Sequence, residues 1–264
     1  MNLSETKIGF IGFGNMAQAI TKGWLLAEKV DPKMLYASAR DQEKLIENTA
    51  DLGIHAMPTN EDLVNKVDLV ILAVKPYQVR DVIAPLEEKL VGKVLLSVAV
   101  NFLYEDFEAL LMEGTEHLSS LPNTPVAFAD GIFLLEEKHS LSEENFKGIK
   151  ELLGSISQVE MIPTSEMDIA GIISGSAPAF VDLFTEALAD AAVKHGLNRQ
   201  RAYQLISQMI RGTANLQLKT KKHPGQLKDE ITSPSGTTIK GIASLEKDAF
   251  RGTLITAVDE ILKD

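Results

Sequence analysis

The 264-residue chain contains no cysteine, which excludes disulfides, thiolate nucleophiles and cysteine-ligated metal sites together. Cations are also scarce. The chain has 26 Lys and Arg against 37 Asp and Glu, and its formal net charge of −11 argues against partners such as nucleic acids or acidic membranes. The five histidines are scattered and form no i,i+4 pair, so we expect no bound metal.

Long apolar runs are missing as well. The longest weakly charged stretch, residues 169–181, is too short to span a bilayer and contains Pro178. Residues 1–7 carry no basic segment followed by an apolar one, so we expect no signal peptide and a cytoplasmic protein. The length suits one large domain or two modest ones.

A glycine-rich motif near the N-terminus organises the chain. Gly12, Gly14 and Ala17 form G-x-G-x-x-A between a predicted strand at residues 7–11 and a predicted helix at 16–28. In this context the glycines let the backbone approach a pyrophosphate, and the helix N-terminus presents N–H groups to the phosphates. A glycine turn without a ligand is the weaker alternative. The predicted cofactor-binding residues here are Gly12, Phe13, Gly14, Asn15 and Met16.

The end of the second predicted strand, residues 34–38, favours NADPH as the cofactor. NAD-binding folds usually have an acidic residue here, which binds the ribose hydroxyls. In this chain the acid is missing and the strand ends in Ser38 followed by Ala39 and Arg40. We predict that Ser38 donates a hydrogen bond and Arg40 a charge-assisted one to the 2′-phosphate. In the alternative, which leaves NADH open, Arg40 is a surface residue paired with Asp41.

Three further predicted strands end at the same crevice. Residues 67–74 form an apolar run typical of a central parallel strand, and further strands are predicted at 94–98 and 117–121, with one helix over 77–90. Ligands bind outside the carboxyl ends of parallel strands. Residues 1–163 are therefore predicted to form a Rossmann-type α/β domain with a mostly parallel, doubly wound sheet. Its further cofactor contacts are predicted to be Val74, Lys75, Pro76, Ala99 and Asn123.

Strand patterns end at residue 163, and residues 164–264 are predicted to form an all-α domain. The helical stretch 166–195, interrupted near Pro178, carries apolar residues on almost every face, which is typical of a buried helix. So short a region has little material to bury this helix by itself. We therefore expect a homodimer in which a second subunit covers it.

A polar loop precedes the helix predicted at residues 238–247. The seven residues 232–238 are all Ser, Thr, Pro or Gly. Hydroxyls and free N–H groups at the start of a helix form a site for a small anion and suit a carboxylate. An ordinary Ser/Thr N-cap is the alternative, and the residues alone do not decide between the two.

Taken together, these stretches resemble the pyrroline-5-carboxylate reductases over essentially the whole chain. The resembling segments are 9–17, 73–76, 121–125, 174–180, 186–191 and, most specifically, 232–241. The resemblance implies reduction of the cyclic imine of 1-pyrroline-5-carboxylate to L-proline by NADPH or NADH, the last step of proline biosynthesis. It also implies a Rossmann domain followed by a helical dimerisation domain and, for many members, assembly into a decamer.

By this resemblance, Thr238 is the catalytic residue and hydrogen-bonds the ring nitrogen. Ser233 and the backbone of Gly236 and Thr237 hold the substrate carboxylate, and a helix of the partner subunit completes each site. Hydride transfer to a C=N bond needs a fixed orientation and a stabilised nitrogen, but no strong nucleophile. The absence of a nucleophile–base pair from the sequence therefore agrees with the implied reaction.

The chain departs from the family pattern at several positions. The family commonly has Arg and Met before Pro-Asn-Thr-Pro, where this chain has residues 119–121, and Ala-Ala-Gly at 99–101; it commonly has Gly at positions 177 and 235, where a Cβ changes the backbone preference. Two other functions stay open: a paralogue that reduces a different cyclic imine acid, and an NADP-binding regulatory protein with little activity. A β-hydroxyacid dehydrogenase is disfavoured because its helix lysine would have to be Lys194, near the helix end.

Overall fold

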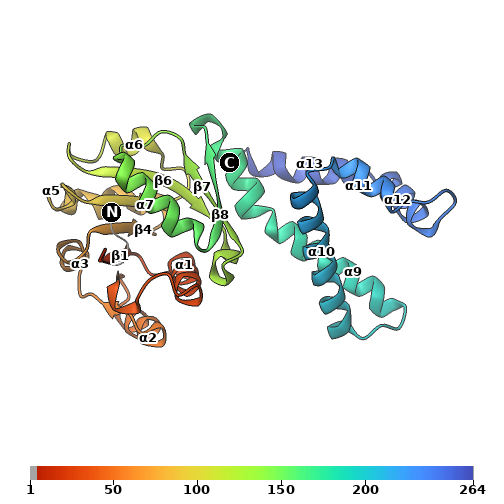
Figure 1. Cartoon of the computed structure of the whole chain (residues 1–264), viewed down its shortest axis with the longest axis horizontal. Helices are drawn as coiled ribbons and strands as arrows, with labels where there is room; N and C mark the ends of the chain where they lie inside the picture. The colour runs from red at the N-terminus through yellow and green to blue at the C-terminus, as the bar shows by residue number, and fades with distance from the viewer. Residues whose placement is uncertain (1–4, 264) are drawn as a thin grey trace. The chain divides into compact units, whose positions relative to one another are not determined.

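Residues 5–263 are described by the structure, a computed structural model, and they divide into two units. One unit reaches to Gly175 and the other starts at Ser176. The first contains a sheet with helices on both faces, and the second is built from helices (Figure 1). Within the described residues, all strands lie before Pro163. The domain boundary predicted between residues 163 and 164 stays a prediction.

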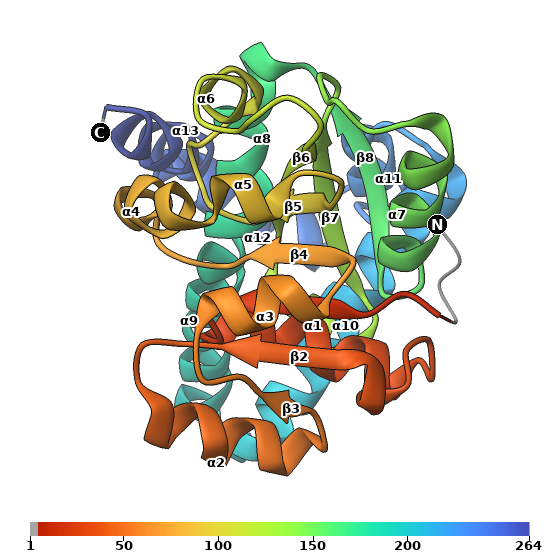
Figure 2. The ribbon, with the colours of Figure 1, turned by 90° about the vertical axis from the view of Figure 1, so that its left-hand side faces the viewer.

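In the described part of the first unit, eight strands form one sheet with the order β3-β2-β1-β4-β5-β6-β7-β8 (Figure 2). Strands β1 to β6 run parallel, β7 is antiparallel to β6, and β8 is parallel to β7. The order of the first six strands is that of dinucleotide-binding sheets. The predicted Rossmann-type sheet is thereby confirmed. The strands are β1 (Ile8–Ile11), β2 (Leu35–Ser38), β3 (His55–Ala56), β4 (Leu69–Leu72), β5 (Val94–Ser97), β6 (Glu116–Pro122), β7 (Gly131–Glu136) and β8 (Ser157–Ile162).

Successive side chains of the central strands point to opposite faces of the sheet, so that the first unit has two hydrophobic cores, one on each face. Ile8 and Phe10 of β1 point into one core, and Ile11 points into the other. The first core is covered by α1 (Asn15–Leu26), α2 (Gln42–Leu52) and α7 (Glu143–Gly154). The second is covered by α3 (Asn60–Lys66), α4 (Val79–Ile83), α5 (Glu87–Leu90) and α6 (Tyr104–Glu108). Since both faces are covered, the central strands β1, β4 and β5 are apolar nearly throughout.

The prediction of a single helix over residues 77–90 was wrong. This segment begins in a 3₁₀ turn, Pro76–Gln78, and continues as α4 and α5, which are separated by a second 3₁₀ turn at Ala84–Leu86. Pro85 lies in that turn, and its ring prevents a continuous α-helix because it removes one backbone donor and clashes with the preceding turn.

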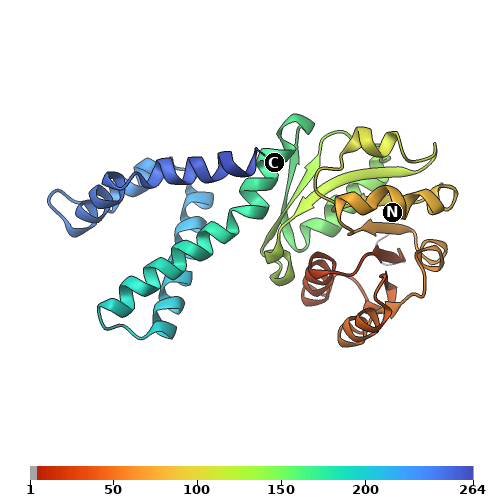
Figure 3. The ribbon, with the colours of Figure 1, turned by 180° about the vertical axis from the view of Figure 1, so that it is seen from behind.

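The helical unit buries few apolar side chains within one chain. Its buried apolar residues are Ala189, Ala202 and Ile206, where α9 packs on α10. Leu183 of α9 remains 66% exposed and Leu218 of α10 69%. A unit with so little interior needs a partner surface to be stable. The helices are α9 (Pro178–Lys194), α10 (Arg199–Thr220), α11 (Pro224–Glu230), α12 (Thr237–Lys247) and α13 (Phe250–Ile261), seen from behind in Figure 3.

A helical run leads from the first unit into the second. It comprises α8 (Met167–Gly171), a π-helical turn at Ile172–Ser176, and α9. Among the described residues, the stretch Thr164–Lys194 is the one long and apolar enough to cross a membrane by length and composition, with 11% of its most apolar window buried. Length and apolarity alone do not separate a membrane span from a helix that packs against another protein surface.

Candidate functional site

Gly12 occupies a turn that only glycine fits. Its φ is +88°, and a Cβ would come within 2.6 Å of the Ala73 carbonyl oxygen and 2.9 Å of Val74 Cγ1. Its N–H donates to the Ser38 carbonyl oxygen at 2.9 Å. The turn therefore lies between the ends of β2 and β4. The structure thus brings together three predicted cofactor residues from three strand ends.

The N-terminus of α1 is open toward solvent. Gly14 is the N-cap residue, and a Cβ built there would meet no atom within 4 Å. No side chain caps the helix, and its first turn has no acidic residue. Gly14 and Asn15 are exposed, Met16 is half-buried, and Phe13 packs into the core. This geometry fits a pyrophosphate bound by the first backbone N–H groups of the helix.

Ser38 has a different environment from the one its predicted role requires. It is 1% exposed, and its hydroxyl donates to Asn60 Oδ1 at 2.8 Å. The hydroxyl is thus engaged within the protein, and Asn60, at the start of α3, lies at the same strand end. Asn60 was not among the predicted site residues, because only the folded arrangement of β2 and α3 reveals that it meets Ser38.

Arg40 is exposed at the end of β2, and the alternative pairing with Asp41 is not formed. Asp41 instead accepts a hydrogen bond from the Lys44 N–H at 3.2 Å and pairs with Lys44 Nζ at 3.7 Å. Within residues 5–263, Arg40 makes no ion pair with an acidic side chain. A free guanidinium at this edge suits a 2′-phosphate.

The residues that follow β4 and β5 lie at the same carboxyl edge of the sheet. Lys75 is exposed, and its N–H donates to Gln78 Oε1 at 3.2 Å, which starts the 3₁₀ turn Pro76–Gln78. Ala99 is buried, and its N–H donates to Ser97 Oγ at 3.1 Å. Two residues later, Asn101 has a φ of +55°. Asparagine tolerates this left-handed conformation better than other residues with a Cβ, so its replacement of the family's glycine costs little.

Asn123 lies directly after β6, and both polar atoms of its side-chain amide have protein partners. Its Nδ2 donates to the Ser174 carbonyl oxygen at 3.0 Å, and its Oδ1 accepts from the Ile132 N–H at 2.9 Å. The residue is at the expected strand end, but its side chain is committed to the protein. Its predicted contact with the cofactor stays a prediction.

The unusual residues before Asn123 are interior residues. Ser119, Ser120 and Leu121 are all buried in β6. The Ser120 hydroxyl donates to the Ser97 carbonyl oxygen at 2.8 Å, whereas the Ser119 hydroxyl has no partner among the described residues. Leu121 packs with Leu134 and Met167. These departures from the family pattern therefore alter the interior of the first unit and not an open pocket.

The loop before α12 places hydroxyl and backbone N–H groups at the N-terminus of that helix. The Gly236 N–H donates to the Ser233 carbonyl oxygen at 3.0 Å, which closes a turn with Pro234 and Ser235 at its centre. A Cβ on Gly236 would come within 2.5 Å of Ser233 Oγ, so glycine lets this hydroxyl lie over the helix N-terminus. The helix has no side-chain cap, and Thr237 and Thr238 are exposed. Since the Gly236 N–H is engaged in the turn, Thr237 and Thr238 supply the free backbone donors.

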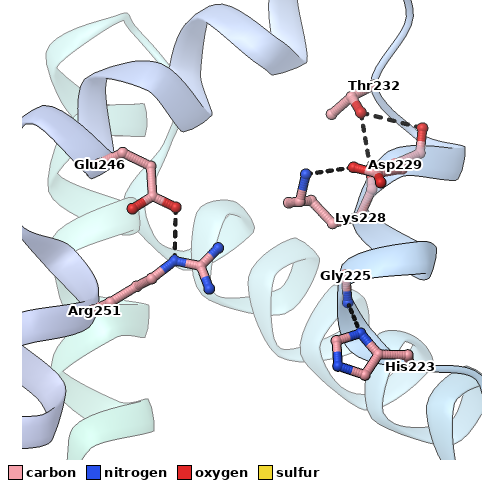
Figure 4. A network of polar contacts seen from close by, with 7 residues as sticks. All are labelled: His223, Gly225, Lys228, Asp229, Thr232, Glu246 and Arg251. Atoms are coloured by element: carbon pink, nitrogen blue, oxygen red, sulfur yellow. Dashed lines mark hydrogen bonds and ion pairs between the residues drawn. The ribbon is translucent and has the colours of Figure 1, made fainter.

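Local contacts hold the N-terminal flank of this loop (Figure 4). Thr232 Oγ1 donates to the Lys228 and Asp229 carbonyl oxygens at 3.2 and 3.1 Å, which closes the end of α11. Beyond the loop, Arg251 pairs with Glu246 at 2.7 Å. The neighbouring cation Lys228 pairs with Asp229. The start of the loop is therefore fixed, and its residues Ser233, Ser235, Thr237 and Thr238 are exposed. Within the described residues, no group of three or more His, Cys, Asp or Glu side chains is placed to hold a metal ion.

Comparisons with known proteins cover both units. Residues 164–264 match a family model described as pyrroline-5-carboxylate reductase dimerisation, and residues 7–101 match one described as NADP oxidoreductase, coenzyme F420-dependent. The pyrroline-5-carboxylate reductase of Treponema pallidum (strain Nichols) is 40% identical, covering 95% of this chain and 97% of its own length. That of Methanosarcina acetivorans is 35% identical, covering 97% and 95%.

Solved structures give the same result. The Plasmodium falciparum pyrroline carboxylate reductase with NADP bound superposes with a TM-score of 0.89 at 30% identity, over 98% of this chain and 96% of that chain. The 1-pyrroline-5-carboxylate reductase of Streptococcus pyogenes gives 0.87 at 30% identity, over 97% and 96%. The dimerisation model spans residues 164–264 and so includes the apolar stretch Thr164–Lys194.

Proposed function

Because the chain belongs to the pyrroline-5-carboxylate reductase family, we propose that it reduces 1-pyrroline-5-carboxylate to L-proline with NADPH as the hydride donor. This is the last step of proline biosynthesis. The observation that carries the proposal is the similarity over nearly the whole chain, 95% of it at 40% identity. The two family models cover the glycine turn and the Ser233–Thr238 loop.

The carboxyl edge of the sheet fits NADPH, because two groups there that can bind its phosphates have no partner among the described residues. The uncapped N-terminus of α1 and the empty space at Gly14 accommodate the pyrophosphate. Arg40, exposed at the end of β2, binds the 2′-phosphate. Val74, Lys75, Pro76 and Ala99 line the strand exits beyond. When bound, NADPH supplies the hydride.

The loop before α12 binds and orients the imine. The Ser233 hydroxyl and the Thr237 N–H hold the substrate carboxylate, and the positive end of the helix dipole adds to this attraction. The Thr238 hydroxyl hydrogen-bonds the ring nitrogen. The C=N carbon takes up the hydride and the nitrogen takes up a proton, so the product is a secondary amine. Fixing the ring in one orientation provides the main rate advantage.

Assembly belongs to the same proposal. We propose a homodimer through the helical unit, with dimers assembling further into a decamer, in a cytoplasmic enzyme. The dimerisation model over residues 164–264 and the exposed apolar residues of α9 and α10 support the dimer. The decamer is supported by the family resemblance.

The test follows NADPH oxidation with 1-pyrroline-5-carboxylate, its six-membered homologue and a thia-analogue. We expect the five-membered imine to be the best substrate. Thr238→Val should lower kcat about 10²-fold, and Ser233→Ala should mainly raise KM. Preference for another ring would favour a reductase of a different imine acid. NADPH binding without turnover of any imine would favour the regulatory protein.

A further inference from the structure

The side chain of Asn123 connects the carboxyl edge of the sheet to the π-helical turn Ile172–Ser176. Its Oδ1 accepts from the Ile132 N–H at 2.9 Å, and its Nδ2 donates to the Ser174 carbonyl oxygen at 3.0 Å. Its own N–H donates to the Ile132 carbonyl oxygen at 3.2 Å. Strand β7 thus fixes the amide in one orientation, in which its donor meets Ser174. Single π-helical turns inside α-helices are frequent at functional sites.

On the other side, Asn123 leads into a 3₁₀ turn, Thr124–Phe128, that is pressed against the cofactor helix α1. A Cβ on Gly23 of α1 would come within 2.1 Å of the Val126 carbonyl oxygen. A Cβ on Gly131 of β7 would come within 2.6 Å of the Val126 N. The turn therefore has little freedom to move relative to α1, and a continuous series of close contacts runs from α1 through Val126 and Asn123 to Ser174.

A second contact holds the same helical segment. A Cβ on Gly171 of α8 would come within 2.9 Å of Leu121 Cδ1, at the end of β6. Leu121 also packs on Met167 of α8. Residues 167–174 are thus fixed to the end of β6 by one apolar contact and one hydrogen bond, immediately before the helical unit begins.

We propose that Asn123 is a positioning residue: it anchors the segment from which α9 starts to the strand edge where the cofactor binds, and does not itself bind the cofactor. The inference rests on the proposed function, because the substrate loop belongs to the helical unit that this segment leads into. Hydride transfer tolerates little displacement of the reacting atoms. Loss of the anchor therefore lowers turnover of the imine and leaves NADPH affinity nearly intact.

Asn123→Asp tests the anchor most directly. The carboxylate keeps an acceptor for the Ile132 N–H but places an oxygen against the Ser174 carbonyl. We expect kcat with 1-pyrroline-5-carboxylate to fall about tenfold or more, with the Kd for NADPH changed less than about threefold. Gly171→Val should act in the same direction, since it displaces the same segment through Leu121. Asn145→Ala is the matched control, because it removes a 2.9 Å amide bond to Glu116 elsewhere in the first unit.

Two outcomes would overturn the proposal. An NADPH affinity that falls as much as kcat in Asn123→Asp would make Asn123 a cofactor contact. Hydrogen–deuterium exchange gives a readout without activity: residues 172–180 should exchange faster in Asn123→Asp, with α1 unchanged, and unchanged exchange there would show that the bond anchors nothing. If the unsubstituted protein reduces no imine, the proposed function fails, while the exchange result still decides whether the anchor exists.

Discussion

Asn101 and Ser235 adopt left-handed backbone conformations at positions where, by the family resemblance, glycine is common. Their φ angles are +55° and +63°. Asparagine tolerates this region, but serine there is strained by about 1 kcal/mol. Ala177, the other replacement of a common glycine, has a φ of −63° and an ordinary helical conformation. Of the three positions, Ser235 therefore carries the largest conformational cost, and it lies in the proposed substrate loop.

Replacing Ser235 with glycine should relieve this strain. We expect Ser235→Gly to stabilise the fold by roughly 0.5 kcal/mol. The relieved strain is larger than this, but glycine loses more conformational entropy on folding than serine does, which offsets part of the gain. Ser235→Ala is the control, because it removes the hydroxyl and keeps the strain. Urea denaturation of the three proteins measures the difference. A glycine variant less stable than the alanine variant would contradict the strain argument.

Under the proposed function, we expect Arg40 to determine the choice between NADPH and NADH. Arg40→Ala should weaken NADPH binding by about 1.5–3 kcal/mol, the value of a hydrogen bond to a charged group, and leave NADH binding nearly unchanged. Lys44→Ala, which removes the cation that pairs with Asp41, is the matched control. Titration calorimetry with both cofactors gives the result. Equal losses for NADPH and NADH would mean that Arg40 does not contact the 2′-phosphate.

At the scale of elements, the connection between β7 and α7 carries an acid-sensitive group. The ring of His139 stacks on Phe146 with centroids 4.4 Å apart, and its buried Nδ1 has no partner among the described residues. Burial, followed by the proximity of His117, lowers the pKa of His139 below its ordinary value of 6.5. Between the folded and unfolded pKa values the unfolded chain binds more protons, so stability falls as the pH drops below about 6.5.

His139→Leu should therefore flatten the loss of stability between pH 7 and pH 5. The substitution keeps an apolar partner for Phe146 and removes the proton acceptor. Denaturant midpoints of both proteins at the two pH values measure the effect. An equally steep loss in the variant would assign the acid sensitivity to other groups.

The elements were predictable where local pattern decides them. Gly12, the apolar strands and the polar loop before α12 each combine residues that are close in sequence. The contacts that refine the site join distant residues: Ser38 meets Asn60, 22 positions away, and Asn123 meets Ser174, 51 positions away. Such pairs depend on how strands and helices are placed side by side, and no single segment contains that information. The break at Pro85 was visible in the sequence but was outweighed by the helical pattern around it.

At the scale of the whole molecule, the helical unit depends on association. Leu183→Asp on α9 places a charge at a residue that is exposed in one chain and is expected to be covered in the dimer. A buried unpaired charge is strongly destabilising, so the variant should be monomeric and lose most reductase activity. Asp182→Asn, next to it on the same helix, is the control. Analytical ultracentrifugation gives the masses, and an unsubstituted chain that sediments as a monomer would contradict the interface.

The two glycines of the turn before α1 lend themselves to opposite experimental uses. Any side chain at Gly12 collides with the end of β4, so a loss of activity there cannot be separated from damage to folding. At Gly14 an added methyl group meets no protein atom within 4 Å, and under the proposed function it extends into the space of the bound pyrophosphate. We therefore expect Gly14→Ala to separate the two effects: a protein that folds and associates normally but no longer binds its coenzyme, against which every coenzyme-independent property can be measured.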